Sequence, residues 1–554
     1  MTAHKPWLDN YPGGIPANID PDKYSTILEY LDEVCKKNAN KPAFSFMGKE
    51  MTYKQLDNLS TQFGAYLQSR GLKPGDKFAI MMPNLPQYPI ALFGALKAGL
   101  VVVNTNPLYT PREMEHQFND SEARGILILE NFAANLEKIL DKTKIDVVLT
   151  ASIGDMLGFP KKHVVNFVIR KVKRMVPRYH LKNTVNFAEA MTQGKKFKIN
   201  SDFENNPHDV IVLQYTGGTT GVSKGAMLTN RNLVANMMQI KTFITPYLKE
   251  GIDQVILAPL PMYHIFAFTI NCLAAMDMGA LSVLVLSPKQ LDTVVKEFDR
   301  YKITGMTGVN TLYNALLNNE KFKNADWTHL QFVAAGGTAL QKSVALEWEK
   351  LTNTIISEGY GMTEASPVVS SNPYGASRLG TVGIPVPSTE VRIITEEGEV
   401  LPLGAIGEIQ VRGPQVMKGY YKKPEETAKT ITADGWLNTG DIGMLDSDGY
   451  LSIVDRKKDM ILVSGFNVYP NEIEDVVAMH PKVLESAAVG IPSEKSGECV
   501  KVFVVKNDKS LSEEELIRHC RENLTGYKVP KEVEFREELP KTNVGKILRR
   551  ALKE

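Results

Sequence analysis

A loop rich in glycine and threonine offers the clearest chemistry in this sequence of 554 residues. Its small residues are Thr216, Gly217, Gly218, Thr219, Thr220 and Gly221. Glycines let the backbone approach a ligand, and successive N–H groups with hydroxyls and one lysine suit a polyphosphate. The spacing excludes a Walker A loop, because Ser223 precedes Lys224 and Gly225 follows it. The pattern predicts a phosphate-binding loop between a strand and a helix capped near Thr229 or Asn230, with a plain surface turn as the alternative.

Five further segments contain residues that could contact a nucleotide or a second substrate. They are 336–338 (Gly-Gly-Thr), 360–364 (Tyr-Gly-Met-Thr-Glu), 439–441 (Thr-Gly-Asp), 464–470 (Ser-Gly-Phe-Asn-Val-Tyr-Pro) and 540–546 (Pro-Lys-Thr-Asn-Val-Gly-Lys). Taken alone, each has an ordinary structural interpretation, such as a core tyrosine, a turn aspartate or one of many tail lysines. Their occurrence together in this order is the reason to treat them as parts of one site.

These segments resemble the signatures of the adenylate-forming superfamily, which includes acyl-CoA synthetases, luciferases and nonribosomal-peptide adenylation domains. The resemblance covers roughly residues 40–554 and is closest to the bacterial long-chain fatty acid–CoA ligases, particularly across 359–373 and 439–550. Two residues depart from the pattern: Ser223 stands where proline is usual, and Asn438 stands where histidine is common. The resemblance implies an enzyme that uses ATP, Mg²⁺ and coenzyme A.

The resemblance assigns most of these residues to ATP. It implies that the loop holds the β- and γ-phosphates, that Tyr360 stacks on adenine, and that Asp441 and Arg456 bond the ribose hydroxyls. Thr216 and Glu364 would hold Mg²⁺, for which a carboxylate is a hard oxygen ligand. An aromatic face suits a purine, and charge-assisted hydrogen bonds would orient the sugar. The other nucleotide-binding residues that it implies are Lys224, Gly336, Gly337, Thr338, Gly361, Met362 and Thr363.

The remaining residues are assigned to the acyl and thiol steps. Lys546 would act on the α-phosphate and the carboxylate as a mobile point charge. Lys458 matches the hinge position of the family, and Gly465 would line the passage for the pantetheine arm of CoA. His264 would position the substrate. Phe268 would gate a fatty acid tunnel, although core packing at the end of a strand explains this residue equally well.

The implied function is activation of a fatty acid by ATP as acyl-AMP, followed by transfer of the acyl group to CoA. Because both reactants of the first step are anionic, catalysis would rest on positioning and charge neutralisation. An aryl- or medium-chain acyl-CoA ligase of the same superfamily is the main alternative, because the acyl pocket lies in the least diagnostic part of the chain. A luciferase-like oxidation and a non-catalytic adenylate-binding protein are more distant, and the second is disfavoured by an intact set of residues. That set is Lys224, Glu364, Asp441, Arg456 and Lys546.

The segments that position these residues alternate between strand-length apolar runs and helical periodicity. This alternation predicts α/β architecture with largely buried sheets. The predicted strands are 209–215, 254–260, 281–286, 331–335 and 354–357, with helices at 230–240 and 291–300. After about residue 377 a small β unit is predicted, with strands at 391–395, 408–411 and 450–454. Beyond the charged run 455–459 the predicted elements are helices 471–480 and 512–524 and strands 485–489, 501–506 and 532–535.

Length and pattern together predict two domains. A large N-terminal domain, 1–455, would contain α/β subdomains and the small β unit. A hinge at 456–459 would connect it to a smaller, mobile α+β domain at 460–554. If Lys546 and Gly465 lie on different faces of the small domain, rotation about Lys458 would present them to the site in turn.

Bulk properties narrow the set of partners. The net charge of +1 gives no global field for binding nucleic acid. The four cysteines are far apart and predict neither a metal site nor a disulfide framework. The longest apolar run, 89–103, is too short to span a bilayer, and the N-terminus does not read as a secretory signal, so a cytoplasmic protein is predicted. The sequence leaves the chain-length optimum and the oligomeric state open, a homodimer included.

One segment bears on peripheral contact with a membrane. Residues 161–182 contain eight Lys/Arg and no acid. Val165, Ile169, Val172 and Val176 would share one face of a helix. Such a helix could lie on the anionic inner face of a membrane, where a fatty acid would be collected. The favoured alternative is a solvated helix whose apolar face packs in the core.

Overall fold

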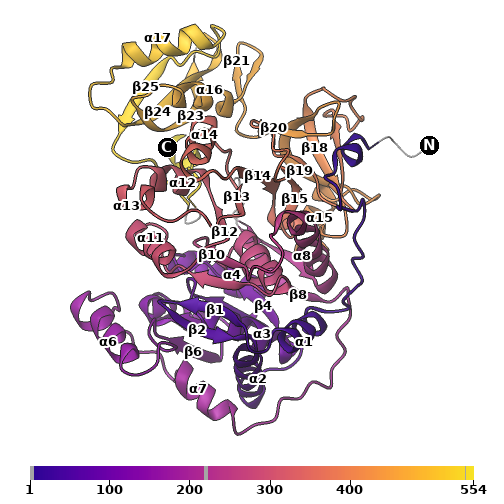
Figure 1. The fold of residues 1–554 in the computed structure, drawn as a ribbon, viewed down its shortest axis with the longest axis vertical. Coiled ribbons are helices and arrows are strands. Elements are labelled where there is room, and N and C mark those ends of the chain that lie inside the picture. Colours follow the sequence, from indigo (N-terminus) through magenta and orange to yellow (C-terminus); the bar gives the residue numbers. More distant parts are fainter. Residues whose placement is uncertain (1–4, 217–222, 494, 543–544, 554) are drawn as a thin grey trace.

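The computed structural model describes residues 5–216, 223–493, 495–542 and 545–553. Figure 1 shows a large N-terminal domain, coloured from indigo to orange, with a smaller yellow domain at one end of it. Within the described residues the strands form four sheets. Two large sheets with helices around them make the body of the large domain, so the expected α/β fold with a smaller C-terminal domain is confirmed.

The first large sheet has seven strands in the order β7-β6-β5-β3-β4-β8-β9. Its strands are β3 (Lys77–Met81), β4 (Val101–Asn104), β5 (Ala123–Leu129), β6 (Val147–Ala151), β7 (Val185–Asn186), β8 (Val210–Thr216) and β9 (Lys224–Thr229). Neighbouring strands pair in parallel except β8 and β9, which are antiparallel. The central strands are buried along their length, which is why they are continuous apolar runs in the sequence.

The second large sheet has nine strands in the order β16-β15-β14-β13-β12-β10-β11-β1-β2. They are β1 (Pro42–Phe46), β2 (Lys49–Thr52), β10 (Val255–Ala258), β11 (Leu281–Leu284), β12 (Gly305–Gly308), β13 (Phe332–Gly336), β14 (Ile356–Gly361), β15 (Val368–Ser371) and β16 (Ile384–Pro385). The six adjacent strands β14, β13, β12, β10, β11 and β1 pair in parallel with one another. At the edges of the sheet, β15 and β16 on one side and β2 on the other pair antiparallel.

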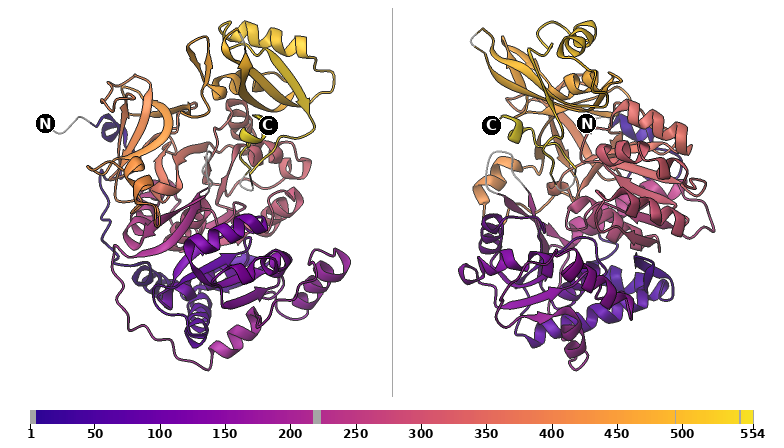
Figure 2. Two further views of the ribbon diagram at one scale, coloured as in Figure 1. Left: turned by 180° about the vertical axis from the view of Figure 1, so that it is seen from behind. Right: turned by 90° about the vertical axis from the view of Figure 1, so that its left-hand side faces the viewer.

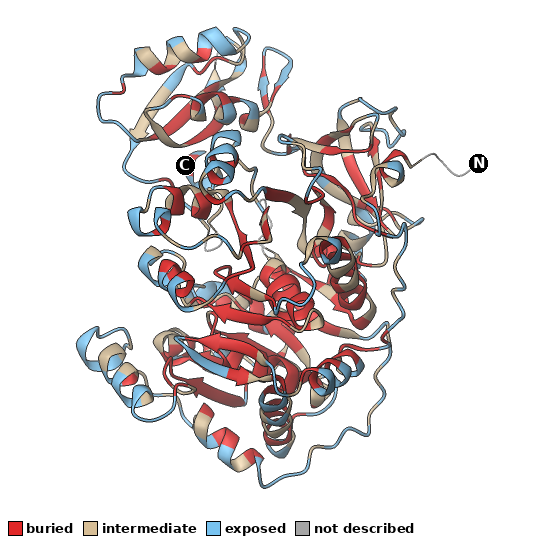
Figure 3. Ribbon diagram, viewed as in Figure 1, coloured by how far each residue is buried: buried red, intermediate tan, exposed pale blue. Residues whose placement is uncertain are grey.

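Helices cover and join these sheets, and Figure 3 shows that buried residues fill the interior between them. Helix α3 (Gln87–Lys97) is buried from Gln87 to Leu96, so it is apolar on all sides rather than amphipathic. Other long helices of the large domain are α1 (Ile27–Lys37), α2 (Tyr53–Ser69), α4 (Pro111–Ser121), α8 (Asn230–Ile244), α11 (Leu291–Arg300), α12 (Asn310–Leu317) and α14 (Lys342–Thr352). Thr229 caps α8 by accepting a hydrogen bond from the Asn232 amide, as the sequence predicts.

The predicted small β unit is a four-stranded antiparallel sheet. Its strands, in spatial order, are β17 (Glu390–Ile394), β18 (Gly407–Arg412), β19 (Leu437–Leu445) and β20 (Leu451–Arg456). Helix α15 (Pro424–Thr430) lies between β18 and β19 in the chain. Because β20 ends at Arg456, the charged run begins where this sheet ends.

The small domain is built on a five-stranded sheet. It contains β21 (Ile461–Val463), β22 (Phe466–Val468), β23 (Val483–Ser493), β24 (Gly497–Lys506) and β25 (Glu532–Arg536), with helices α16 (Pro470–Ala478), α17 (Glu513–Asn523) and α18 (Arg550–Lys553). Helices α16 and α17 pack on this sheet over a shared apolar core. Both views of Figure 2 show the yellow domain against the end of the large domain that is opposite the indigo strands.

Two local expectations are wrong. The glycine–threonine loop joins β8 to β9, so the motif is strand–loop–strand, and helix α8 begins only after β9. The basic helix is also shorter than expected: α6 (Lys161–Phe167) continues as a π-turn that ends at Val172. Val165 and Ile169 pack against the core, but Val172 is exposed, so the four residues do not form one buried face. None of the described helices combines the length and apolar character needed to cross a bilayer.

Candidate active site

The candidate site lies at the carboxyl ends of parallel strands in the nine-stranded sheet. Strands β10, β12, β13 and β14 lead into 260–264, Val309, 336–338 and 360–364 respectively. Because parallel strands end on the same side of a sheet, these short segments meet at one edge. The fold therefore brings together motifs that are up to a hundred residues apart in the chain.

Lys224 lies at the start of β9, paired with Thr216 at the end of β8. Its ammonium group forms an ion pair with Glu426 on α15 and lies 5.2 Å from the centre of the Tyr420 ring. The five loop residues from Gly217 to Gly221 lie outside the described residues, as does Val222. The structure therefore places the two ends of the predicted phosphate loop beside each other, with a carboxylate holding the lysine.

Glu364 lies in a 3-10 turn that follows β14, and its side chain is buried. Its Oε1 accepts a hydrogen bond of 2.7 Å from the Tyr420 hydroxyl, and its backbone oxygen accepts one of 2.8 Å from the Met417 amide. Burial raises the pKa of this carboxyl, and the bond from Tyr420 opposes that shift. A divalent cation would favour the ionised form. Glu364 therefore offers carboxylate oxygens just after the end of β14, as expected for a ligand of Mg²⁺.

The segment between β14 and Glu364 is tightly packed. A β-carbon on Gly361 would lie 2.2 Å from the Pro367 carbonyl oxygen, so no larger residue fits there. The Met362 amide donates to the same oxygen at 3.0 Å, and Thr363 begins the 3-10 turn. These three residues fix the direction of the chain between Tyr360 and Glu364.

Tyr360 and Asp441 are in direct contact. The Tyr360 hydroxyl donates a 2.6 Å hydrogen bond to Asp441 Oδ2. Asp441 stands opposite Arg456 in the β19–β20 ladder, and Arg456 Nε lies 3.6 Å from Asp441 Oδ1. Burial and the neighbouring carboxylate raise the pKa of Tyr360 well above its usual value, so its hydroxyl stays protonated. The proposed adenine and ribose residues thus form one group, joined by a hydrogen bond and an ion pair.

Lys546 enters the large domain beside the predicted adenine loop. Gly337 has a φ of +83°, and a β-carbon placed on it would lie 3.2 Å from Lys546 Cε. Lys546, His264, Gly336 and Gly337 line a narrow cavity of about 10 Å³. Thr338 follows in the same loop, and within the described residues its buried hydroxyl has no hydrogen-bond partner. That hydroxyl is a donor left for a ligand.

Electrostatics in this cavity favour a neutral histidine beside a lysine of reduced basicity. Burial lowers the pKa of His264 to about 3, and the charge of Lys546 adds to the effect. Burial also lowers the pKa of Lys546 to about 8, with a further contribution from Arg456. His264 Nδ1 accepts a 3.4 Å hydrogen bond from the Phe266 amide. His264 is therefore suited to positioning, and Lys546 is the group here that carries charge.

Three predicted residues lie away from this cavity. Lys458 follows β20 and is exposed, although the loss of hydration near the surrounding protein atoms, with the charge of Arg456, lowers its pKa to about 8. Gly465 joins β21 to β22 with a φ of +84°, and open space surrounds the position of its missing β-carbon. Phe268 is 1% exposed and packs in the large core, not in the lining of the Lys546 cavity.

Residues 31–421 match the family model for AMP-binding enzymes, and residues 472–546 match the model for the C-terminal domain of these enzymes. The chain belongs to the AMP-binding enzyme family. Among relatives, it is 54% identical to a long-chain-fatty-acid–CoA ligase of Yersinia pestis, over 99% of this chain and 98% of the relative. It is 39% identical to a long-chain-fatty-acid–CoA ligase of Bacillus subtilis, over 100% and 98% of the two chains.

Solved structures of other AMP-binding enzymes have the same fold over nearly the whole chain. The anthranilate CoA ligase AuaEII, in complex with anthranoyl-AMP, matches with a TM-score of 0.85 at 25% identity and covers 96% of this chain and 98% of its own. ATP-bound MatB from Rhodopseudomonas palustris matches with a TM-score of 0.80 at 27% identity, over 94% and 97% of the two chains. The agreement in fold extends through both domains.

Sequence reasoning missed two residues of this candidate site, Tyr420 and Glu426. Tyr420 contacts Glu364, and Glu426 contacts Lys224, so both touch proposed ATP ligands. Neither belongs to a periodic pattern or to a motif that the sequence offers. The one local signal is Pro424, the first residue of α15, which marks a helix start and not a function.

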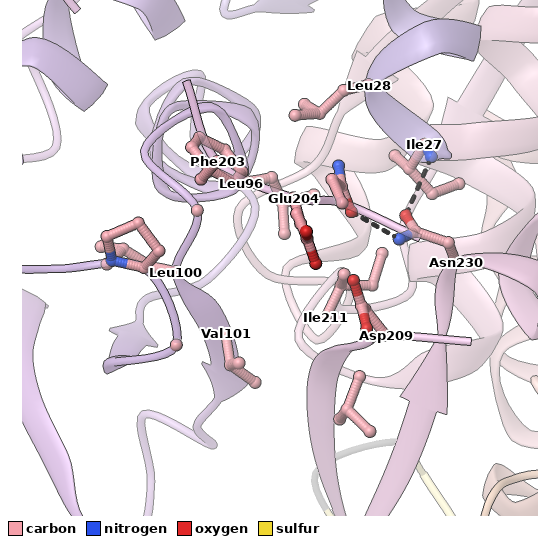
Figure 4. Close-up of a pocket in the computed structure, with 15 residues that line it drawn as sticks. Ile27, Leu28, Leu96, Leu100, Val101, Phe203, Glu204, Asp209, Ile211 and Asn230 are labelled. Carbon is pink, nitrogen blue, oxygen red and sulfur yellow. Dashed lines mark hydrogen bonds between the residues drawn. The ribbon is translucent and has the colours of Figure 1, made fainter. Parts of the chain in front are cut away.

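A separate cavity of about 270 Å³ lies at the amino ends of strands in the seven-stranded sheet (Figure 4). It is lined by residues before and at the starts of β3, β4 and β8, among them Gly75, Val101 and Asp209. At its edge Asn230 bonds to the Ile27 amide. Since Thr216 is at the far end of β8, this cavity is not part of the candidate active site.

Proposed function

We propose that the chain is a long-chain fatty acid–CoA ligase that forms acyl-AMP from ATP and a fatty acid and then acyl-CoA. The observation that carries this proposal is the placement of Lys546, which comes from the small domain and lies beside His264 and Gly337 in the site of the large domain. The similarity to long-chain-fatty-acid–CoA ligases over the whole length supports the same activity. ATP, Mg²⁺ and CoA are its cofactors and co-substrates.

In the first half-reaction a carboxylate oxygen attacks the α-phosphorus of ATP, and the bond to the pyrophosphate oxygen breaks. Lys546 places a positive charge beside the two anionic reactants, the carboxylate and the α-phosphate. Lys224 neutralises charge on the β- and γ-phosphates. Thr216 and Glu364 would hold Mg²⁺, which withdraws charge from the leaving pyrophosphate. Tyr360, Asp441 and Arg456 orient the adenosine. In the second half-reaction the CoA sulfur attacks the acyl carbon, and AMP leaves with the carboxylate oxygen.

The proposed domains are 1–455 and 460–554, joined by a hinge at 456–459. The arrangement described here suits the first half-reaction, because Lys546 is inserted while Gly465 is exposed to solvent. Rotation about Lys458 would withdraw the tail and bring the Gly465 turn to the acyl-AMP. Within the described residues, only the chain neighbours of Gly465 come within 4 Å of a β-carbon built on it, which is consistent with a surface that meets another surface only after rotation.

The test is carboxylate-dependent exchange of pyrophosphate into ATP, measured over a series of fatty acid lengths with and without CoA. Lys546→Ala should abolish exchange but spare thioester formation from supplied acyl-AMP. The matched control is Lys553→Ala, which removes an exposed lysine of the same tail. Equal loss of both half-reactions in Lys546→Ala would contradict the assignment. If no acid supported pyrophosphate exchange, the proposal that the chain is an acid-activating enzyme would be rejected.

The same series of acids tests which class of acid the enzyme prefers. Aryl and medium-chain acids belong in it, because an anthranilate CoA ligase shares the fold. A preference for long chains over benzoate-like acids supports the proposal, and the reverse order favours the aryl alternative. Phe268 stays a proposed gate of the acyl tunnel, to be checked by exchanging it for leucine and repeating the series.

We further propose that α6 and the turn after it contact an anionic membrane surface. Phe159 is 89% exposed and Phe167 is 61% exposed; Phe159 comes just before the basic segment 161–182, and Phe167 lies within it. In Figure 1 α6 lies at the periphery of the molecule. Exposed aromatic side chains within a basic segment suit an interface where apolar groups enter the acyl region and cations meet phosphate.

Flotation on phosphatidylglycerol vesicles, compared with phosphatidylcholine vesicles, tests this contact. Replacement of Lys171, Lys173 and Arg174 by alanine should reduce binding to the anionic vesicles. A triple alanine variant at the exposed Lys195, Lys196 and Lys198 is the control for net charge. Equal flotation of both variants would contradict the proposal. The homodimer stays a prediction, which light scattering in solution will decide.

A further inference from the structure

The C-terminal tail forms a hairpin that carries Lys546 from the small domain to the large one. The Thr542 amide donates a 2.6 Å hydrogen bond to the Lys546 carbonyl, which closes the hairpin. Ile547 packs against the core of the small domain. At the tip, the Gly545 carbonyl accepts a 3.4 Å hydrogen bond from the Thr311 hydroxyl of α12. The position of the ammonium group thus depends on how the base of this hairpin is held.

Arg549 lies at that base, three residues after Lys546. Its side chain is 16% exposed and contacts several acceptors at once. Nε and Nη2 donate to the two carboxylate oxygens of Glu474 at 2.9 and 2.7 Å. Nη2 also donates to Asn471 Oδ1, and Nη1 donates to Asp455 Oδ1 at 3.2 Å. Glu474 and Asn471 belong to α16 of the small domain, but Asp455 belongs to β20 of the large domain.

Asp455 is buried at the end of β20, immediately before the hinge. Its Oδ1 also accepts a 2.7 Å hydrogen bond from the Arg456 amide, and its Oδ2 accepts one of 2.8 Å from the Asn471 amide. Asp459, within the hinge, lies 3.7 Å from Arg549. The guanidinium group therefore bridges the two sides of the segment 456–459.

We propose that Arg549 is a positioning residue for adenylation, which fixes Lys546 beside Gly337 by bridging Asp455 and Glu474 across the hinge. The proposal rests on the proposed function and deepens it. A planar guanidinium can bond two carboxylates in fixed directions, and an ammonium group cannot reproduce that geometry. Loss of either partner leaves the other charge buried and unpaired, so the small domain would no longer be held in this orientation.

The bridge also defines what must be broken when the small domain turns. Arg549 moves with the tail and α16, and Asp455 stays with β20. The pair with Glu474 lies within one rigid unit and persists, but the contact with Asp455 is lost. Thioester formation does not use this contact, so removing it should affect only the first half-reaction.

The test compares Arg549→Lys with Arg550→Ala in the full chain. Arg550 is the adjacent residue and is exposed, so it is a matched control for charge. In Arg549→Lys, pyrophosphate exchange should fall about 100-fold, the loss expected for a catalytic group displaced by about 1 Å. Thioester formation from supplied acyl-AMP should stay within about twofold of the unaltered enzyme. Arg550→Ala should leave both rates unchanged.

Asp455→Asn provides an independent arm that does not depend on the stability of Arg549→Lys. It should reproduce the selective loss of exchange, and the double variant should be no slower than the slower single variant, because both substitutions disrupt the same contact between Arg549 and Asp455. The proposal would be overturned if Arg549→Lys exchanged pyrophosphate at the wild-type rate, or if it lost both half-reactions equally. It would also be overturned if the rate losses of the two single variants multiplied in the double variant. If the unaltered enzyme shows no exchange with any acid, the proposed function fails instead.

Discussion

Lys546 and Gly337 meet across the boundary between the two domains: a β-carbon on Gly337 would lie 3.2 Å from Lys546 Cε and 3.8 Å from its Nζ. The glycine therefore leaves the space that the aliphatic part of the lysine occupies. Its φ of +83° adds a second reason for glycine, because L side chains rarely adopt this conformation. Gly337 serves the insertion of the tail as well as the proposed adenine loop.

Gly337→Ala should lower the rate of adenylation by about 10- to 100-fold, because the methyl group displaces Lys546 and the backbone is strained. Pyrophosphate exchange measures this loss. Thioester formation from supplied acyl-AMP should fall much less. Gly404→Ala is the control, since Gly404 has a φ of +84° and open space around it, so that it tests backbone strain alone. A similar loss of exchange in both variants would contradict the steric explanation.

Adenylation should decline above about pH 8. The pKa of Lys546 is lowered to about 8 by burial, so the proportion of charged lysine falls as the pH rises through that value. For the free enzyme, kcat/KM for ATP should then decrease about tenfold per pH unit. Bound phosphates favour the charged form, so the decline of kcat should begin at higher pH. A profile of kcat/KM that stays flat to pH 10 would show that the charge of Lys546 is not required.

Glu426→Gln should lower the KM for ATP by about two- to fivefold. In the absence of nucleotide, Glu426 holds the Lys224 ammonium that we assign to the phosphates, so ATP must compete with this carboxylate. An ion pair that is still partly open to solvent contributes little, which limits the gain. Glu425→Gln, at the neighbouring exposed position of α15, should leave the KM unchanged. An increase in KM would indicate that Glu426 helps to hold the metal or the phosphates.

Phe268→Ala should destabilise the large domain by about 3–5 kcal/mol, because removing a buried aromatic ring from a packed core leaves a cavity. Unfolding in urea measures this change. Phe268→Leu should cost about 1 kcal/mol and serves as the conservative comparison. A changed preference for chain length with unchanged stability would instead indicate that the ring is a gate and not a packing element.

Much of the fold could be predicted from the sequence where one pattern dominates. Helix α11 occupies the predicted residues 291–300, and buried strands such as β13 and β25 lie within about one residue of their predicted bounds. The strand β9 was missed because Lys224-Gly225-Ala-Met-Leu-Thr is short and directly precedes a strong N-cap at Thr229. Capping signals give the start of a helix but not the conformation of what comes before it.

The candidate site was predictable as a set of residues but not as an arrangement. Local motifs pointed to Tyr360, Glu364, Asp441 and Lys546, and the fold brings their segments to one edge of a sheet. The contact of Tyr360 with Asp441 could not be foreseen, because it depends on how the four-stranded sheet packs against β14. For the same reason no sequence pattern revealed that Arg549 reaches back to Asp455, 94 residues earlier.

The exposed position of the Gly465 turn, while the tail occupies the site, has a consequence for steady-state kinetics. If the small domain alternates as we propose, one chemical face is available at a time, and pyrophosphate must depart before the tail can be exchanged for the thiol-binding face. Double-reciprocal plots of velocity against ATP at several fixed CoA concentrations should then give parallel lines, the pattern of a ping-pong enzyme. Free pyrophosphate should restore intersecting lines, because it makes the first half-reaction reversible.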